Sequence, residues 1–241
     1  SLNEYHRMGE IGLFRTEEHF ELLEGLLIWN TDRTDMDQVQ KATFLQTALP
    51  LRRFSLDEYQ HLIAAGLLAE DEQLELIDGL ILEMSPINPK HAACLDALSE
   101  VFTVKLYKQA RIRVQSPVAL ALHASQPQPD LTVAKLRPDG YWQQHPREDE
   151  ILLVIEVSDS TLEKDQDEKL ALYAQAGVLE YWIANLVDEQ FEVHREPYLS
   201  ATGKADYKTK LTFTRGQMLA PLRFPDCRIE VSEILPNQGN D

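Results

Sequence analysis

Ile151-Leu-Leu-Val-Ile-Glu-Val157 is the clearest β-strand in the sequence. Its apolar residues do not alternate with polar ones, which is typical of a strand that is covered on both faces. Thr161 can cap a helix that ends near Gly177, and Glu180-Tyr-Trp-Ile-Ala184 follows as a second core strand. Together with the elements before them, these segments predict an α/β domain with a mixed β-sheet flanked by helices.

Shorter elements flank this strand on both sides. Asp78-Gly79 is typical of a two-residue hairpin turn, and Asn88-Pro89 places a capping residue before a first-turn proline. The elements predicted before the strand are a helix from Ser55 to about Ala65, a hairpin over residues 74–84, a helix to about Gln109 with Leu95, Leu98, Phe102 and Leu106 on one face, and extended segments over residues 111–122 and 129–134. Those after it are strands over residues 191–194, 211–213 and 227–231.

The first 45 residues are expected to form a separate extension. Glu21-Leu-Leu-Glu-Gly-Leu-Leu27 resembles Glu75-Leu-Ile-Asp-Gly-Leu-Ile81, and each predicts a hairpin around a glycine. A partial duplication and chance both explain the similarity. Residues 31–40 are rich in Thr, Asp and Gln and predict a linker. We therefore predict an N-terminal extension with a hairpin over residues 1–45, a main domain over residues 46–236 and a disordered tail over residues 237–241.

The composition is that of a protein with an ordinary core. Hydrophobic residues make up 44% of the 241 residues, and the longest apolar runs fall far short of the roughly 20 residues that cross a bilayer. The first residues show neither a basic start nor a long apolar stretch, so no secretory signal is expected. Cys94 and Cys227 stand in no paired motif, so we expect no disulfide framework, no thiolate zinc site and a cytoplasmic location.

The net charge of −17 disfavours nucleic acid as a partner, because phosphate contacts depend on Lys and Arg. The charge is uneven, however. Residues 90–137 contain seven basic and three acidic residues, a net charge of +4, which leaves −21 for the rest of the chain. Lys90, Arg111 and Arg113 in this segment are candidates for contacts with nucleic acid. The alternative is a solvated surface with scattered charge.

Glu156 is the most informative polar residue. A carboxylate near the end of such an apolar strand costs several kcal/mol if it is ionised and unpaired, so it must be protonated, paired with a cation or bound to a metal. Asp130 follows Pro129 at the start of another short strand. Two carboxylates that converge from neighbouring strands form an oxygen site suited to Mg²⁺ or Mn²⁺. The alternatives are a turn at Asp130 and a structural pair between Glu156 and an arginine.

Three further residues are candidates for the same site. Lys169 lies on the predicted helix, beside residues that should face the sheet, where it can orient water or stabilise a phosphate. Its alternative is a surface pair with Asp165, four residues earlier. Glu75 and His91 could also reach the site, although a histidine on an apolar face is more often a core residue. No serine-hydrolase elbow and no Gly-rich phosphate loop is present.

An ordered series of motifs resembles a known family. The series consists of Glu75-Leu-Ile-Asp-Gly-Leu-Ile81, Met84-Ser-Pro86, His91, Pro129-Asp-Leu131, Glu156-Val-Ser158, Asp165, Lys169, Tyr173, Gly177-Val178 and Glu180-Tyr-Trp-Ile183. It is similar to the restriction-endonuclease domain family that was long known as a domain of unknown function, within the PD-(D/E)xK nuclease superfamily. The resemblance covers about residues 52–235. It implies a restriction-endonuclease-like α/β core (helix, three strands, helix, strand) and a PD-(D/E)xK nuclease-like domain over residues 46–236.

The resemblance also implies roles for individual residues. Asp130 stands at the aspartate of the PD motif and Glu156 at the second acidic position. Ser158 replaces the usual lysine two residues later, and Lys169 on the following helix stands where this family has a substitute. Glu75 matches a glutamate thought to join the site. The N-terminal extension and the acidic net charge depart from the pattern, and they bear on DNA cleavage more than on the fold.

The expected function is therefore Mg²⁺-dependent (or Mn²⁺-dependent) hydrolysis of phosphodiester bonds by a DNA endonuclease. Asp130 and Glu156 would ligate the metal with the Val157 carbonyl and Glu75, and Lys169 would position water. His91 and Asp165 are expected to contact these ligands and orient them without binding the metal themselves. The rival hypotheses are a nuclease fold that binds nucleic acid or protein without turnover, and an adaptor with an acidic surface. Monomer and homodimer both stay open, and no membrane association is expected.

Overall fold

The computed structural model describes residues 7–8, 11, 13, 20–23, 26–29, 51–68 and 72–235. The chain divides into two compact units, residues 1–83 and 84–241. The predicted linker at residues 31–40 and the predicted tail at residues 237–241 lie outside the described residues. The predicted domain bounds at residues 45 and 236 stay predictions. Within the described ranges, no helix has the length and apolar character needed to cross a membrane.

The first unit contains two hairpins and a helix. Their bounds are β1 Phe20–Leu23, β2 Leu26–Trp29, α3 Leu56–Ala64, β3 Leu74–Ile77 and β4 Leu80–Glu83. Both hairpins are antiparallel. Ser55 caps α3 as predicted, because its side chain accepts a hydrogen bond from the Glu58 N–H. Asp78 and Gly79 both have a positive φ, of 46° and 77°, which confirms the predicted turn.

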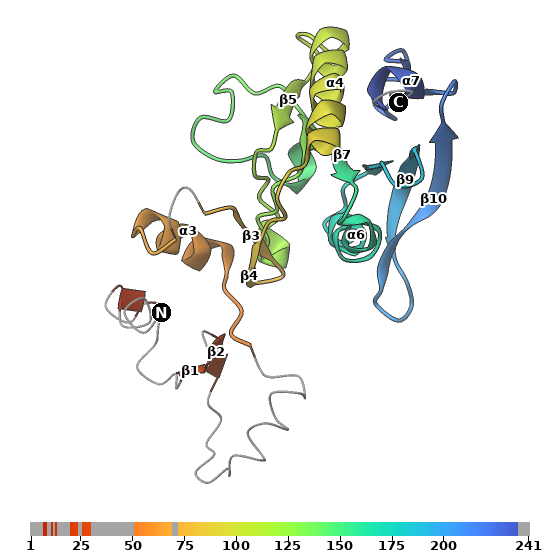
Figure 1. Cartoon of the computed structure of the whole chain (residues 1–241). Coiled ribbons are helices and arrows are strands. Elements are labelled where there is room, and N and C mark those ends of the chain that lie inside the picture. Colours follow the sequence, from red (N-terminus) through yellow and green to blue (C-terminus); the bar gives the residue numbers. More distant parts are fainter. Residues whose placement is uncertain are drawn as a thin grey trace. The chain divides into compact units, whose positions relative to one another are not determined.

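The second unit is built on a six-stranded mixed sheet with the order β10-β9-β8-β7-β6-β5. Its strands are β5 Arg111–Val114, β6 Leu131–Ala134, β7 Ile151–Ser158, β8 Glu180–Asn185, β9 Gln190–Leu199 and β10 Ala205–Thr214. β7 and β8 are parallel, and the other neighbours are antiparallel. The strand that is clearest in the sequence is therefore central, and the predicted mixed sheet flanked by helices is confirmed (Figure 1).

Smaller elements complete this unit. They are the 3₁₀ turns Ala121–His123 and Glu148–Glu150, the two-stranded sheet of β11 Met218–Leu219 and β12 Ile229–Glu230, and helix α7 Val231–Ile234. The predicted segments at residues 211–213 and 227–231 thus belong to β10 and to the β12–α7 junction. Cys94 and Cys227 are both buried and free, in agreement with the expectation of no disulfide.

Side chains of β7 alternate between two faces of the sheet. Leu153 and Val157 lie in the main hydrophobic core, which also contains the apolar face of α4 (Pro89–Lys105). Glu156 points to the opposite face, where it contacts Tyr173 of α6 (Leu170–Gln175). A single strand therefore contributes to the apolar core with one face and carries an acidic residue on the other.

Helix α4 confirms the predicted N-terminal cap and buried face. The Asn88 side chain accepts a hydrogen bond from the His91 N–H. The buried apolar residues of this face are Leu95, Leu98, Phe102 and Leu106. The helix ends at Lys105 rather than near Gln109, because Lys108 adopts a left-handed conformation with a φ of 59°, which an α-helix does not continue through.

The helix after β7 differs from the single α-helix that the sequence predicts. It consists of α5 (Leu162–Lys164), a π-helical turn (Asp165–Lys169) and α6. Thr161 lies at the N-terminal position, but its hydroxyl donates to Asp165 Oδ2 instead of capping the helix. Single π-helical turns inside α-helices are frequent at functional sites. Here the turn contains two predicted site residues, at its first and last positions.

Candidate active site

Asp130 and Glu156 meet at one end of the paired strands β6 and β7. The register pairs Leu131 with Ile155, so its continuation places Asp130 opposite Glu156. The Asp130 N–H donates to Glu156 Oε2 over 3.4 Å. The structure therefore brings together the two carboxylates that the sequence singled out.

Asp130 contacts residues of two elements, β7 and α4. Its Oδ2 accepts a hydrogen bond of 2.8 Å from the Val157 N–H and lies 3.1 Å from His91 Nε2. In a β-strand the N–H and C=O of one residue point to the same side, so the Val157 carbonyl also faces the side of Asp130. His91 lies in the first turn of α4, where the Asn88 cap holds its backbone. The structure thus places Val157 and His91 in contact with Asp130.

Glu156 is almost fully buried, with 2% of its surface exposed. Its Oε1 accepts hydrogen bonds from Lys169 Nζ over 3.0 Å and from the Tyr173 hydroxyl over 2.8 Å. The sequence did not predict a site role for Tyr173. A signal for it exists, because a residue four positions after Lys169 shares its helix face.

The ionised form of Glu156 is disfavoured in this environment. The pKa of the Glu156 carboxyl is raised to about 8, because the effect of burial, together with the nearby Asp130 and Asp165, exceeds the lowering by Lys169. Desolvation thus outweighs the attraction of the lysine. Lys169 alone therefore does not stabilise the ionised form of Glu156 at neutral pH beside Asp130 and Asp165. An additional cation would favour the ionised carboxylate.

Asp165 links Lys169 to the end of β7. Its Oδ2 accepts hydrogen bonds of 2.7 Å from the hydroxyls of Ser158 and Thr161, and its Oδ1 lies 3.8 Å from Lys169 Nζ. Lys169 thus makes the (i, i+4) pair with Asp165 that the sequence offered as an alternative, but the pair is buried and Glu156 is the closer partner of the lysine. Ser158, at the position where the superfamily usually has lysine, holds the acid beside the lysine that arrives from the helix.

The donor set fits a hard divalent cation. Within the described part of the chain, no cluster of three or more His, Cys, Asp and Glu side chains is arranged to hold a metal ion. Asp130, Glu156 and the Val157 carbonyl offer oxygen atoms only, and Mg²⁺ commonly uses one or two carboxylates and keeps several waters. Burial, and to a smaller extent Asp130, raise the pKa of the Cys94 thiol to about 12, so this cysteine supplies no thiolate. These features favour Mg²⁺ or Mn²⁺ over zinc.

The other predicted site residues are Glu75, Lys90, Arg111 and Arg113. Glu75 is buried in β3 of the first unit, so its role in the site stays a prediction. Lys90 is exposed in the first turn of α4, beside His91. On β5, Val114 pairs with Leu131, whereas Arg111 pairs with Ala134, about 10 Å further from the Asp130 end.

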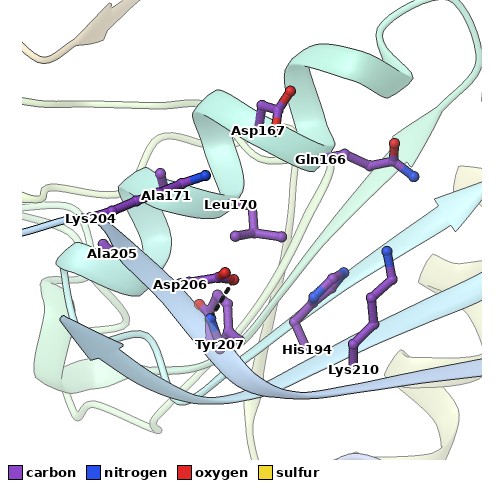
Figure 2. Close-up of a pocket in the computed structure, with 10 residues that line it drawn as sticks. All are labelled: Gln166, Asp167, Leu170, Ala171, His194, Lys204, Ala205, Asp206, Tyr207 and Lys210. Atoms are coloured by element: carbon purple, nitrogen blue, oxygen red, sulfur yellow. Dashed lines mark hydrogen bonds between the residues drawn. The ribbon is translucent and has the colours of Figure 1, made fainter. Parts of the chain in front are cut away.

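A pocket of about 290 Å³ is lined in part by the π-helical turn (Figure 2). Gln166 and Asp167 face it from the helix, and His194 and Lys210 face it from β9 and β10. His194 is 2% exposed, and within the described residues its Nε2 has no hydrogen-bond partner, although Glu192 Oε2 lies 3.8 Å away. The pocket contains none of the predicted site residues but shares one helical turn with Asp165 and Lys169.

Comparison with known proteins gives one family and one fold. The family model described as "Putative restriction endonuclease" (Uma2) matches residues 56–232. A crystal structure of a putative nuclease belonging to DUF820, from Anabaena variabilis ATCC 29413, is similar with a TM-score of 0.54 and 17% sequence identity. The similarity covers 76% of this chain and 97% of that chain. At this identity it shows the fold, a mixed sheet with flanking helices. No curated protein matches the chain.

Proposed function

Since the chain belongs to the family of putative restriction endonucleases named Uma2, we propose that Asp130, Glu156 and Lys169 form the active site of a metal-dependent DNA endonuclease. The observation that supports this most is the convergence of two acidic residues and a lysine at the end of β6 and β7, with Lys169 Nζ 3.0 Å from Glu156 Oε1. An acidic pair with a neighbouring lysine matches the chemistry of phosphodiester hydrolysis, which needs charge stabilised at the phosphate and a positioned water.

Each residue has a distinct role in this proposal. Asp130 and Glu156 would hold the ion with the Val157 carbonyl, and His91 would fix the orientation of Asp130. A bound Mg²⁺ or Mn²⁺ would stabilise charge on the phosphate and lower the pKa of the attacking water. Tyr173 keeps the Glu156 carboxylate in one orientation through its hydrogen bond.

Lys169 would act on water and phosphate. It is 9% exposed and lies between Glu156 and Asp165, so its ammonium group is held in one place rather than moving freely in solvent. From this place its N–H groups can donate to the incoming water or to a phosphate oxygen as charge develops there. The lysine then supplies positive charge next to two acids that would otherwise repel the phosphate.

The test is nicking of supercoiled plasmid by the full chain in Mn²⁺. We expect weak nicking that EDTA stops, because the net charge of −17 disfavours non-specific DNA. Glu156→Ala, purified in parallel, separates the activity of this site from a contaminating nuclease. Failure of the wild type to nick with any divalent metal, on single-stranded, duplex or RNA substrates, would reject turnover.

Duplex binding should be strongly salt-dependent if the basic segment contacts phosphates. The log–log slope of affinity against salt is expected to be about −0.9 for each phosphate neutralised, because counterions are released. Arg111→Ala combined with Arg113→Ala should remove one or two phosphate contacts and so reduce the magnitude of this slope by about 0.9 to 1.8. Fluorescence anisotropy at several salt concentrations measures it. Arg223→Ala, an exposed arginine outside the segment, is the matched control and should leave the slope unchanged.

A binding-only protein is the second candidate function, and the acidic net charge, which disfavours turnover of DNA, favours it in its protein-binding form. This candidate keeps the fold and the carboxylate cluster but lacks turnover. It predicts duplex or protein binding by the wild type and by Glu156→Ala with the same affinity, and no nicking by either. Absence of duplex affinity even at low salt would instead favour an adaptor that recruits a basic protein.

A further inference from the structure

The arginines of β5 project onto the same face of the sheet as Glu156. Ile112 packs against the core on the α4 side, so its neighbours Arg111 and Arg113 point to the opposite face. Arg113 pairs with Thr132, which in turn pairs with Val154, two residues before Glu156 on β7. Because β5 is the edge strand, these arginines lie at the border of the face that contains the candidate active site.

A tyrosine fixes the loop that covers this edge. The guanidinium carbons of Arg113 and Arg137 lie 5.7 and 5.0 Å from the centre of the Tyr141 ring. The Tyr141 hydroxyl donates to the Lys135 carbonyl over 2.8 Å. Arg113 Nη2 also lies 3.3 Å from His145 Nδ1. The loop therefore has a defined position against β5, with two cations on one aromatic ring.

Trp142, the next residue, is 90% exposed. The Trp142 N–H donates to the Asp139 carbonyl, which closes a turn around Gly140. Arg111 Nη2 lies 3.6 Å from the position that a side-chain carbon on Gly140 would occupy, so the Arg111 side chain lies against the same turn. An indole exposed to this extent is unfavourable in water, and the turn that carries it lies against the Arg111 side chain.

We propose that Trp142 and Arg111 form a binding platform for an unpaired nucleic-acid strand: a base stacks on the indole and the guanidinium contacts its phosphate. Bases in a duplex already stack on one another and offer no free face, whereas an unpaired base does. The proposal rests on the proposed function, since it specifies the strand that reaches the Asp130–Glu156 site. Along β6, Ala134 lies about 14 Å from Asp130, comparable to about four stacked nucleotides.

The platform is tested by binding, without turnover. The full chain is titrated in EDTA with a fluorescein-labelled 20-nucleotide single strand and, separately, with the matching duplex. We expect tighter binding to the single strand and quenching of the fluorescence of the exposed Trp142, measured as the part of the tryptophan quenching that Trp142→Ala removes. Trp142→Ala should weaken single-strand binding about 5- to 150-fold, the usual effect of losing one stacked base, whereas Trp142→Phe should retain part of it.

Matched controls separate stacking from other effects. Leu199→Ala, which removes a 63% exposed apolar side chain from β9, four strands away from β5, should leave affinity unchanged. Equal affinity of wild type and Trp142→Ala for the single strand would overturn the proposal. A change in oligomeric state with unchanged strand affinity would assign Trp142 to self-association and overturn it as well. A wild type that does not nick plasmid but binds the single strand through Trp142 would reject the proposed turnover and leave the platform standing.

Discussion

Lys169→Met should reduce plasmid nicking by about 10²–10⁴-fold, the usual loss when one group that orients water or stabilises developing charge is removed. The aliphatic stem of the lysine packs beside α6, and methionine replaces that part of the side chain with similar volume. Metal binding should persist in the variant, because Asp130 and Glu156 remain. The measurement is the initial rate of nicking in Mn²⁺ by wild type and variant.

The fold should tolerate this substitution near neutral pH. Without Lys169, the pKa of Glu156 rises further above 8, so the buried carboxyl takes up a proton and avoids an unpaired charge. The variant should therefore lose stability relative to the wild type only as the pH rises above about 8, where the wild-type carboxylate is ionised beside Lys169. Circular dichroism at pH 7 checks that the variant is folded.

Lys204→Met is the matched control for charge. It removes one lysine from the β9–β10 hairpin, an exposed position away from the carboxylates, and should leave nicking nearly unchanged. Equal nicking by wild type and Lys169→Met would refute the role of the lysine while leaving the acidic residues as candidates.

Asp130→Asn should abolish most of the thermal stabilisation by metal. An ion that binds only the folded state at 100 times its Kd adds about 2.7 kcal/mol to the free energy of unfolding. For a unit of 150 to 250 residues this corresponds to a rise in Tm of about 5–10 °C in the wild type. The asparagine cannot supply the negative charge that attracts the ion, so the rise should nearly disappear. Differential scanning fluorimetry with and without Mn²⁺ or Mg²⁺ measures it.

Two comparisons make the metal result specific. Asp226→Asn, an exposed aspartate away from the site, carries the same charge change and should keep the full rise in Tm. The Tm of Asp130→Asn in EDTA reports the cost of losing the hydrogen bond between Asp130 Oδ2 and the Val157 N–H, apart from any metal. A metal-induced rise of the same size in wild type and Asp130→Asn would contradict the proposed ligand.

The local sequence contains enough information to predict the elements of the fold. An uninterrupted apolar run predicts the central strand β7, because only a strand covered on both faces tolerates it. Asn88-Pro89 and Asp78-Gly79 predict a helix start and a hairpin turn, since capping and positive φ depend on one or two residues. The buried position of Glu156 also follows from its strand. Because an ionised carboxylate is costly in such a place unless it is paired, the sequence alone makes Glu156 a candidate site residue.

Contacts between elements were decided only by the tertiary structure. The π-helical turn depends on where Asp165 meets Ser158 and Thr161, and no helical periodicity contains that information. Tyr173 became a partner of Glu156 because the helix is held over β7. The position of Arg111 against the turn at Gly140, which carries Trp142, depends on a loop folding back on an edge strand. Propensities and caps act over a few residues, whereas these contacts join residues far apart in sequence, and only the packing of the whole sheet determines which of them meet.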